Sequence, residues 1–408
     1  MVGPHEAGRS GVSEGEEDVK TSEERILTTH TGALYRPRDL EELLKAKILG
    51  QPYDADLLEQ RLRTAVAEVV RDQARYGVDI VNDGEFSKPS WTSYVSERLS
   101  GLEYRDRPIS VESSLPGKDV EAFGDFYHHY GHIWPLEDWE IGPAGDYPVA
   151  PVVTGPIAYA GQEAIGRDIK NLKDAMEGVS VEEGFLPVVA PGSVQPVLAN
   201  EYYPDDESYF GAIADCLHEE YKAIVDAGLV VSIDDAFMPY LYDLRGDWSL
   251  EDFRAWANLA VEALQAALAG IPEDRVRYHI CWGSWNGPHS ADVPLRDIVD
   301  LVLRIPAQAY NIESANPRHA HEYKVWEDVK LPDGKILIPG VVEHATNILD
   351  HPEVVADRIR RFADIVGRER VIAGTDCGHR GRVPRELAWA KQQAIADGAA
   401  IATRQLWP

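Results

Sequence analysis

Short apolar runs alternate with longer stretches of helical periodicity along most of the chain. The helical pattern is clearest over residues 55–76, where apolar side chains recur every three or four positions and Gly77 follows as a stop signal. Further helices are expected over residues 206–227, 249–270, 352–367 and 383–399. The short apolar runs between helices are typical of buried strands. Strands are therefore expected at residues 26–32, 79–83, 149–154, 229–235, 276–282, 308–313, 335–342 and 371–376.

Eight strand candidates that alternate with helices predict an α/β protein with a (β/α)8 TIM barrel. A ninth apolar run, FLPVVAP at residues 185–191, exceeds that count. Pro187 and Pro191 cannot donate to a strand ladder, so this run is expected at an edge or in an excursion outside the barrel. A doubly wound open sheet is the main alternative, but no strand candidate is followed by the glycine fingerprint of a dinucleotide fold.

The chain is predicted to hold one catalytic domain behind a flexible tail. Residues 1–24 are rich in Gly, Ser and Glu and lack apolar periodicity, which predicts a disordered acidic tail. Residues 25–408 are predicted to form the single barrel domain. Two irregular segments, at about 104–147 and 182–205, are expected to be insertions that act as lids or substrate loops.

The first insertion is unusually aromatic. It contains Phe126, Trp134 and Trp139 among many other rings. Such a density of aromatic side chains is too high for a solvated loop. We therefore expect this insertion to form part of a pocket wall or a contact between copies of the chain.

The charge balance limits the partners of the protein. Among 408 residues there are 69 acidic and 40 Lys or Arg residues, which give a net charge of −29. This charge argues against nucleic acid or an anionic membrane surface as a partner. A cytoplasmic setting is expected, because the chain has three cysteines, no signal-peptide pattern and no long apolar run. Small molecules are the expected partners, and the alternative of self-association into a homo-oligomer is left open by the sequence.

Polar side chains collect where the predicted strands end, which is the face of a barrel that carries chemistry. They include His279 and Cys281 at the end of one strand, Glu313 at the end of the next and Cys377 directly after the last. One nitrogen, two sulfurs and one oxygen make a tetrahedral zinc set. The third cysteine, Cys216, falls within a predicted helix and is interpreted as a packing residue.

These motifs resemble cobalamin-independent methionine synthase, specifically its C-terminal zinc barrel. The resemblance runs from about residue 26 to 382. Within this family, the sequence is more similar still to the short single-barrel branch, which includes epoxyalkane:coenzyme M transferase. The motifs that carry it are TTHTGALYRP (28–37), VNDGEF (81–86), VTGP (153–156), SIDD (232–235), HIC (279–281), NIES (311–314), PGVVEH (339–344) and GTDCG (374–378).

The resemblance implies roles for individual residues. His279, Cys281, Glu313 and Cys377 match the family's zinc ligands, and Glu85 and Asp234 match positions that bind the amino group of homocysteine. His344 falls near a histidine that protonates the leaving group, although the spacing differs by one residue. The first loop departs from the family, since Ala33 stands where a serine holds the carboxylate of the amino acid. The remaining substrate-binding candidates are His30, Arg318 and Arg380.

The implied activity is that of a Zn²⁺-dependent S-alkyltransferase that holds a thiol as a thiolate and alkylates it. Methyl transfer to a thiol such as homocysteine is the leading hypothesis, and thiol addition to an epoxide is the alternative. Two hypotheses of other classes are a metal-free lyase that resembles uroporphyrinogen decarboxylase and a binding barrel with a structural metal. The two cysteines at the strand ends favour the transferase, because the lyase has no need of them.

Overall fold

The computed structural model describes residues 20–106, 117–130, 141, 149–283 and 285–408. Within them the strands are β1 (Ile80–Val81), β2 (Leu99–Arg105), β3 (Ala150–Tyr159), β4 (Glu183–Val189), β5 (Ala199–Asn200), β6 (Val230–Asp234), β7 (Val276–Ile280), β8 (Ala309–Ile312), β9 (Ile336–Val342) and β10 (Gly374–Thr375).

The helices of the described residues vary from one turn to six turns in length. They are α1 (Arg38–Ile48), α2 (Ala55–Arg75), α3 (Lys118–Ala122), α4 (Gly124–Tyr130), α5 (Gln162–Met176), α6 (Pro191–Val194), α7 (Asp206–Asp226), α8 (Phe237–Leu244), α9 (Leu250–Ala267), α10 (Val299–Val302), α11 (Val325–Asp328), α12 (Pro352–Val366) and α13 (Arg385–Leu406). Short 3-10 turns are η1 (Ser93–Arg98), η2 (Glu273–Arg275), η3 (Leu295–Asp297), η4 (Glu322–Lys324) and η5 (Arg368–Arg370).

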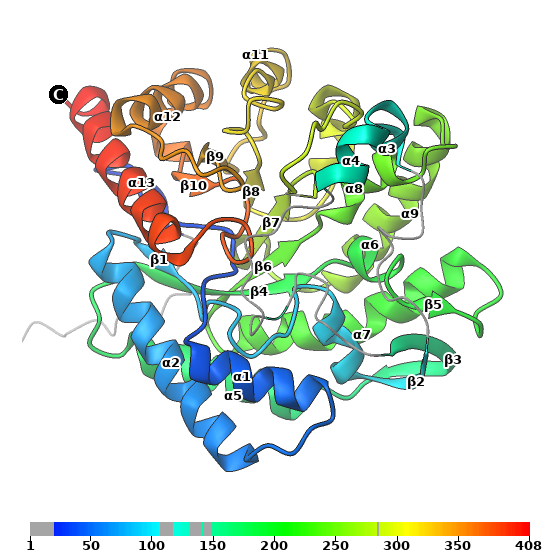
Figure 1. The fold of residues 1–408 in the computed structure, drawn as a ribbon. Coiled ribbons are helices and arrows are strands. Elements are labelled where there is room, and N and C mark those ends of the chain that lie inside the picture. The colour runs from blue at the N-terminus through cyan, green and yellow to red at the C-terminus, as the bar shows by residue number, and fades with distance from the viewer. Residues whose placement is uncertain (1–19, 107–116, 131–140, 142–148, 284) are drawn as a thin grey trace, which may run out of the picture.

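Seven strands form one parallel sheet in the order β1-β4-β6-β7-β8-β9-β10. An extended segment completes the ring between its two edges. Thr28 makes a parallel bridge to Ala373 beside β10, and its carbonyl accepts the amides of Asp79 and Ile80 beside β1. The sheet therefore closes as the predicted eight-stranded barrel, with the longer helices packed around it (Figure 1).

One barrel position is occupied by a different strand from the one predicted. Residues 185–191 contribute most of β4, which pairs with β1 and β6, whereas residues 149–154 lie in β3 of a separate sheet, β2-β3-β5. Pro187 is tolerated because its missing N–H falls on an edge that no strand uses. The ladder with the two-residue β1 has already ended there. Val189, which faces the same edge two residues later, donates its amide to Tyr94 Oη instead.

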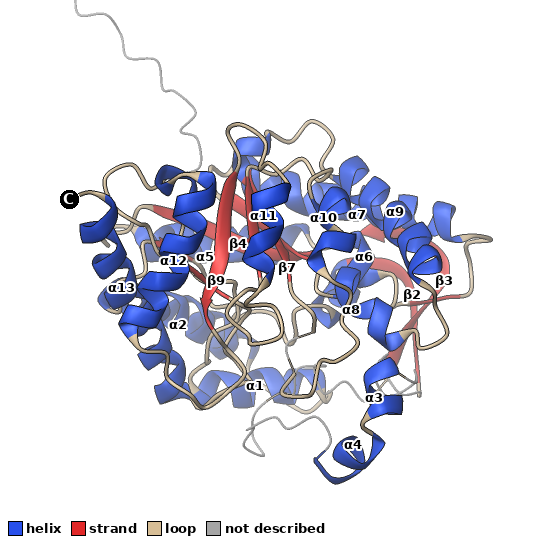
Figure 2. Cartoon of the chain, turned by 90° about the horizontal axis from the view of Figure 1, so that it is seen from above, coloured by secondary structure: helices blue, strands red, loops and turns tan. Residues whose placement is uncertain are grey.

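The five predicted helices are present, and four of them, α2, α7, α9 and α12, begin at a capping side chain. Asp54 accepts the amide of Leu57 at the start of α2, and Ser249 and Asp252 form a reciprocal capping box at the start of α9. The last helix, α13, continues to Leu406, beyond the predicted end at residue 399. Figure 2 shows these helices surrounding the strands of the barrel.

The chain is packed against the barrel from residue 20 onward. Ser22 is buried, and its hydroxyl donates to the carbonyl of Val371 while accepting the amide of Leu27. Residues 20–24 are therefore bound rather than loose, and the rest of the predicted tail, residues 1–19, lies outside the described residues. No helix within the described ranges has both the length and the apolar character that crossing a membrane requires.

The described parts of the aromatic insertion contact the mouth of the barrel. Tyr127, in α4, donates to Asp119 and accepts the indole N–H of Trp285, which lies in the loop after β7. Phe126 is partly buried, whereas Trp134 and Trp139 lie outside the described residues. The other predicted insertion, residues 182–205, is instead made of β4, α6 and β5.

Candidate metal centre and pocket

Three of the four predicted zinc ligands meet at the C-terminal end of the barrel. His279 lies in β7, Cys281 directly follows that strand, and Cys377 follows β10. One ligand atom of each lies within 4.8 Å of the others, and the two sulfurs are 3.6 Å apart. Residues two apart on a strand point to the same face. This spacing is why β7 can turn both His279 and Cys281 toward Cys377.

The imidazole of His279 is placed as a ligand would be. The residue is 0 % exposed, and neither ring nitrogen has a hydrogen-bond partner among the described residues. Burying a polar ring without a partner costs free energy. A nitrogen that is orphaned beside two sulfurs would gain its missing interaction from a metal ion, so the donor set fits zinc.

The charges of this group also suit a cation. The Cys281 thiol donates to Cys377 and so holds the pKa of Cys377 well below its usual range, with help from His279 and against the effect of burial. The same contact, together with burial, raises the pKa of Cys281. Burial alone would lower the pKa of His279, but Cys377 and Asp234 raise it. The surroundings of Cys377 thus favour its thiolate form, and a bound dication would displace the proton that Cys281 holds.

Glu313, the fourth predicted ligand, does not fall within this group. It forms a second buried group with His344 and Asp376, whose ligand atoms also lie within 4.8 Å of one another. One oxygen of Glu313 accepts the amide of Trp282 at 3.0 Å, and the other is buried without a hydrogen-bond partner in the described part of the chain. The charge of Glu313 still raises the pKa of His279 and of Cys281. Glu313 therefore adjoins the metal group with one oxygen available.

His344, the predicted acid, is fully buried after β9. Both of its ring nitrogens lack a partner among the residues that the structure describes. The loop that carries it is held by Glu343, whose carboxylate accepts the amides of Ala345 and Thr346 at 2.7 and 2.8 Å. Lys391, from α13, donates to the carbonyl of Glu343 at 2.7 Å. His344 thus has a fixed backbone and an uncommitted ring.

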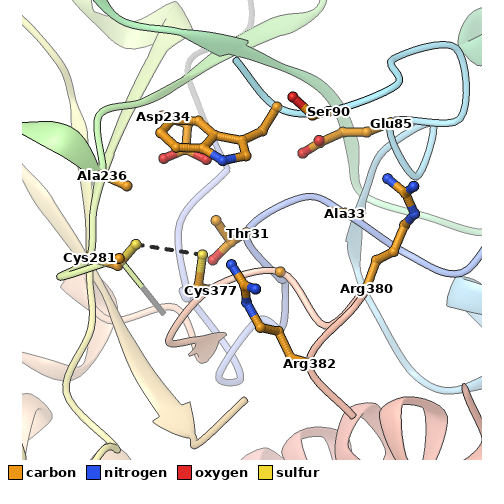
Figure 3. A pocket seen from close by; sticks show the side chains of 13 residues that line it. Thr31, Ala33, Glu85, Ser90, Asp234, Ala236, Cys281, Cys377, Arg380 and Arg382 are labelled. Atoms are coloured by element: carbon orange, nitrogen blue, oxygen red, sulfur yellow. Dashed lines mark hydrogen bonds between the residues drawn. The ribbon is translucent and has the colours of Figure 1, made fainter. Parts of the chain in front are cut away.

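A cavity of about 70 Å³ opens beside the two sulfurs. Its lining combines Cys281 and Cys377 with the acidic Glu85 and Asp234 and the basic Arg380. In Figure 3 the two sulfurs lie on one side of the pocket, while Glu85 and Arg380 lie on the other. The remaining lining residues are Thr31, Ala33, Ser90, Trp91, Ala236, Gly283, Gly378 and Arg382.

The two pocket carboxyls are strongly perturbed by burial. Burial raises the pKa of Glu85 from 4.5 to about 7, with Lys88 opposing the rise. Burial also raises the pKa of Asp234 well above its usual range, and one of its oxygens has no partner among the described residues. A cationic group placed between these carboxyls would favour their charged forms. Both acids predicted from the sequence therefore line the pocket, and an ammonium bound between them would lower their raised pKa values.

The local backbone brings Glu85 into the pocket at a steric limit. Glu85 has φ 59°, which is rare for a residue with a side chain, and its amide bonds to Asp83 Oδ1 at 2.9 Å. The side chain then passes over Gly32, where an added Cβ would lie 2.1 Å from Glu85 Oε1. The glycine of the Thr31-Gly32-Ala33 turn is thus required by the position of the Glu85 carboxyl.

Of the other three substrate-binding candidates, one lines the pocket and two are not among its lining residues. Arg380 lines the pocket. Arg318 is exposed beyond the end of β8 and is not among the lining residues. His30 is 1 % exposed, and its Nε2 lies 2.8 Å from the amide oxygen of Gln73, away from the lining. Burial lowers the pKa of His30 to about 4, so this ring is a neutral structural group.

Sequence reasoning missed Ser90 and Trp91 and placed the strand at residues 149–154 in the barrel. Ser90 and Trp91 line the pocket but belong to a segment without periodicity. Their place shortly after the VNDGEF motif is the one sequence feature that could have indicated a role in the site. Thr154, the last residue of the strand predicted at 149–154, belongs to β3 of the outer sheet. The error follows from the exchange of β3 and β4 in the predicted strand order.

Comparison with known proteins gives matches over most of the chain. No protein-family model matches. A 2-hydroxypropyl-CoM lyase from Xanthobacter autotrophicus is 26% identical over 384 residues, covering 87% of this chain and 89% of that protein. A methionine synthase from Sulfolobus acidocaldarius is 24% identical and covers 93% of both chains. These relatives confirm the resemblance to the methionine synthase family and its short branch.

Solved structures share the fold. A B12-independent methionine synthase from Shewanella sp. W3-18-1 superposes with a TM-score of 0.69 at 19% identity, covering 94% of this chain and 99% of that chain. A B12-independent methionine synthase described as putative, from Listeria monocytogenes, gives 0.64 at 18% identity with the same coverage. The agreement confirms the barrel architecture.

Proposed function

We propose that this protein is a zinc-dependent S-alkyltransferase, with His279, Cys281 and Cys377 holding the metal and Glu313 as the fourth ligand. The observation that carries the proposal is the buried, orphaned imidazole beside two sulfurs 3.6 Å apart at the base of a pocket. Glu313 supports the set because its charge raises the pKa of His279 and of Cys281, and one of its oxygens has no hydrogen-bond partner among the described residues.

A zinc ion in this site would lower the pKa of an incoming thiol and keep it in the nucleophilic thiolate form. The donor set favours this chemistry over water activation, because two thiolates and a carboxylate make the metal electron-rich. The chain's own groups then bind and orient the thiol and exclude water. His344, buried with an uncommitted ring, is the group that we assign to protonate the leaving group.

The pocket supports a small thiol that carries charge at its other end. Glu85 and Asp234 offer carboxylates to an ammonium, and Arg380 offers a guanidinium to a carboxylate or sulfonate. The methyl side chain of Ala33 lines the same pocket. It cannot supply the hydroxyl with which the family's serine holds the carboxylate of homocysteine, so the anionic end depends more heavily on the arginine.

Two alkyl donors fit this proposal, and each has support from a relative. Methyl transfer is favoured by the similarity to the methionine synthase of Sulfolobus acidocaldarius. Thiol addition to an epoxide is favoured by the similarity to the 2-hydroxypropyl-CoM lyase of Xanthobacter autotrophicus and by the alanine at position 33. The acceptor side of the pocket is the same in both cases, so a thiol experiment tests the shared part first.

The test is calorimetric titration of the zinc-loaded protein with homocysteine, coenzyme M, glutathione and cysteine in two buffers of different ionisation enthalpy. Binding of the preferred thiol should release about one proton near neutral pH, because the metal stabilises the thiolate. The order of affinities then separates methionine synthesis, which requires homocysteine to bind best, from the coenzyme M reaction. If no thiol binds with proton release, the proposal fails.

A further inference from the structure

A buried carboxylate on α1 connects the pocket arginine to the rest of the mouth. Glu41 is 2 % exposed, and its Oε1 lies 2.9 Å from Nη2 of Arg380. The same oxygen accepts the amide of Ile141 at 2.7 Å, and Arg380 donates back to the carbonyl of Ile141 at 3.1 Å. Arg380 is therefore held by Glu41 and Ile141 through Nη2, and its Nη1 also donates to the carbonyl of Pro89 at 3.4 Å.

The second oxygen of Glu41 reaches a different part of the pocket. Its Oε2 lies 2.8 Å from Nη1 of Arg36, which is fully buried. Arg36 in turn donates to the carbonyls of Glu85 and Phe86, at 3.1 and 3.0 Å, and to that of Lys88. These are the carbonyls of the turn in which Glu85 adopts its left-handed conformation. Arg36 thus fixes the backbone that aims the Glu85 carboxyl.

The buried network of Glu41, Arg36 and Arg380 is not explained by stability alone. A buried ion pair contributes little net stability compared with apolar side chains of the same volume, while removal of one partner leaves an unpaired buried charge. Burial alone would raise the pKa of Glu41, but Arg36 and Arg380 hold it at about 2, so the carboxylate stays charged across the physiological range. A permanently charged group between two guanidiniums fixes the direction of both.

We infer that Glu41 is a positioning residue that orients both charged walls of the pocket, Arg380 directly and the Glu85 turn through Arg36. This inference rests on the proposed thiol transferase activity and deepens it by assigning the preference for charged thiols to one residue outside the pocket lining. The favoured thiol carries an anionic group, at the end opposite its sulfur, that binds Arg380. Where this end also carries an ammonium, Glu85 binds the ammonium. A thiol without charge gains nothing from this arrangement.

The test substitutes Glu41→Gln, which keeps the shape and one carbonyl oxygen but removes the charge. The matched control is Glu42→Gln, one position along α1, where an exposed carboxylate pairs with the exposed Arg38. Zinc content is measured first, and then the dissociation constants for coenzyme M, homocysteine and the uncharged 2-mercaptoethanol. Glu41→Gln should retain zinc. The ratio of the dissociation constant for 2-mercaptoethanol to that for a charged thiol should fall by at least about tenfold, because hydrogen bonds between charged groups are lost. Glu42→Gln should keep the preference.

The outcomes separate this inference from the proposed function. If the unmodified protein binds no thiol, the proposed function fails and the inference fails with it. If it binds all three thiols equally, or if Glu41→Gln weakens all three by the same factor, the inference is wrong while the proposed function stands. Should Glu41→Gln fail to fold, Arg380→Gln gives the decision, because it leaves the Arg36–Glu41 pair intact. An unchanged preference for coenzyme M in Arg380→Gln would overturn the inference.

Discussion

Replacement of Glu85 by glutamine should stabilise the metal-free protein at alkaline pH while weakening its binding of aminothiols. Glu85 is 6 % exposed, and burial raises its pKa from 4.5 to about 7. Glutamine has nearly the same shape and passes over Gly32 in the same way, but it carries no charge to bury. The substitution therefore isolates the energetic cost of placing a carboxylate in this pocket.

The sign and size of the effect follow from proton linkage. Because the folded state holds the proton of Glu85 to a higher pH than the unfolded state, this group makes stability fall as pH rises from 4.5 to about 7. The difference of about 2.5 pKa units corresponds to about 3 kcal/mol. Glu85→Gln should thus be more stable than the unmodified chain by up to about 3 kcal/mol at pH 8 and nearly equal to it at pH 4.

The assay is urea unfolding of chelator-treated protein at pH 4, 6 and 8, with Glu42→Gln as the exposed control. The difference between Glu85→Gln and the unmodified protein should grow with pH, and the control should show none. A gain of stability that is the same at every pH would refute the reasoning, because it would locate the effect in packing. In the zinc-loaded protein the same variant should bind homocysteine more weakly and 2-mercaptoethanol equally well.

Three further predictions concern the metal, the turn at Gly32 and the insertion. Cys281→Ser and Cys377→Ser should each lose zinc on elemental analysis, whereas Cys216→Ser, buried in α7, should retain it; zinc loss in Cys216→Ser would contradict the ligand assignment. Gly32→Ala should displace the Glu85 carboxyl and cost about 1–3 kcal/mol in urea unfolding, because its Cβ would lie 2.1 Å from Glu85 Oε1, and unchanged aminothiol affinity would argue against this. Tyr127→Phe should lower stability by about 1 kcal/mol through loss of its bonds to Asp119 and Trp285, and a melting temperature equal to that of the unmodified protein would show that α4 does not dock there.

The barrel could be predicted from the sequence because its strands are short apolar runs between amphipathic helices. The exchange of β3 and β4 could not be predicted. Proline is excluded from a strand only where its missing N–H would face a paired neighbour, and the sequence does not show which strands are neighbours. Pro187 lies in a central strand, at a point where the neighbouring ladder has ended. The run VAPVVT at residues 149–154, most of which lies in β3, has the same apolar character as a barrel strand.

The core of the candidate site could be predicted because its residues follow strands that end at the same face. His279 lies in β7 and Cys281 directly follows that strand, and the parallel order of the sheet brings Cys377 beside them. Arg318 could not be distinguished from Arg380 by sequence, since both follow ligand-bearing strands. In the structure Arg380 lines the pocket and pairs with Glu41, which lies more than 300 residues away in the chain, and sequence spacing does not reveal that pairing.

The measurement that tests the central claim most directly is zinc-edge X-ray absorption of the loaded protein with and without its preferred thiol. The ligand set predicts two sulfur neighbours for the zinc in the absence of thiol, contributed by Cys281 and Cys377. With saturating thiol the number of sulfur neighbours should rise to three. An unchanged sulfur count under saturating thiol would contradict the claim that this centre activates a thiol.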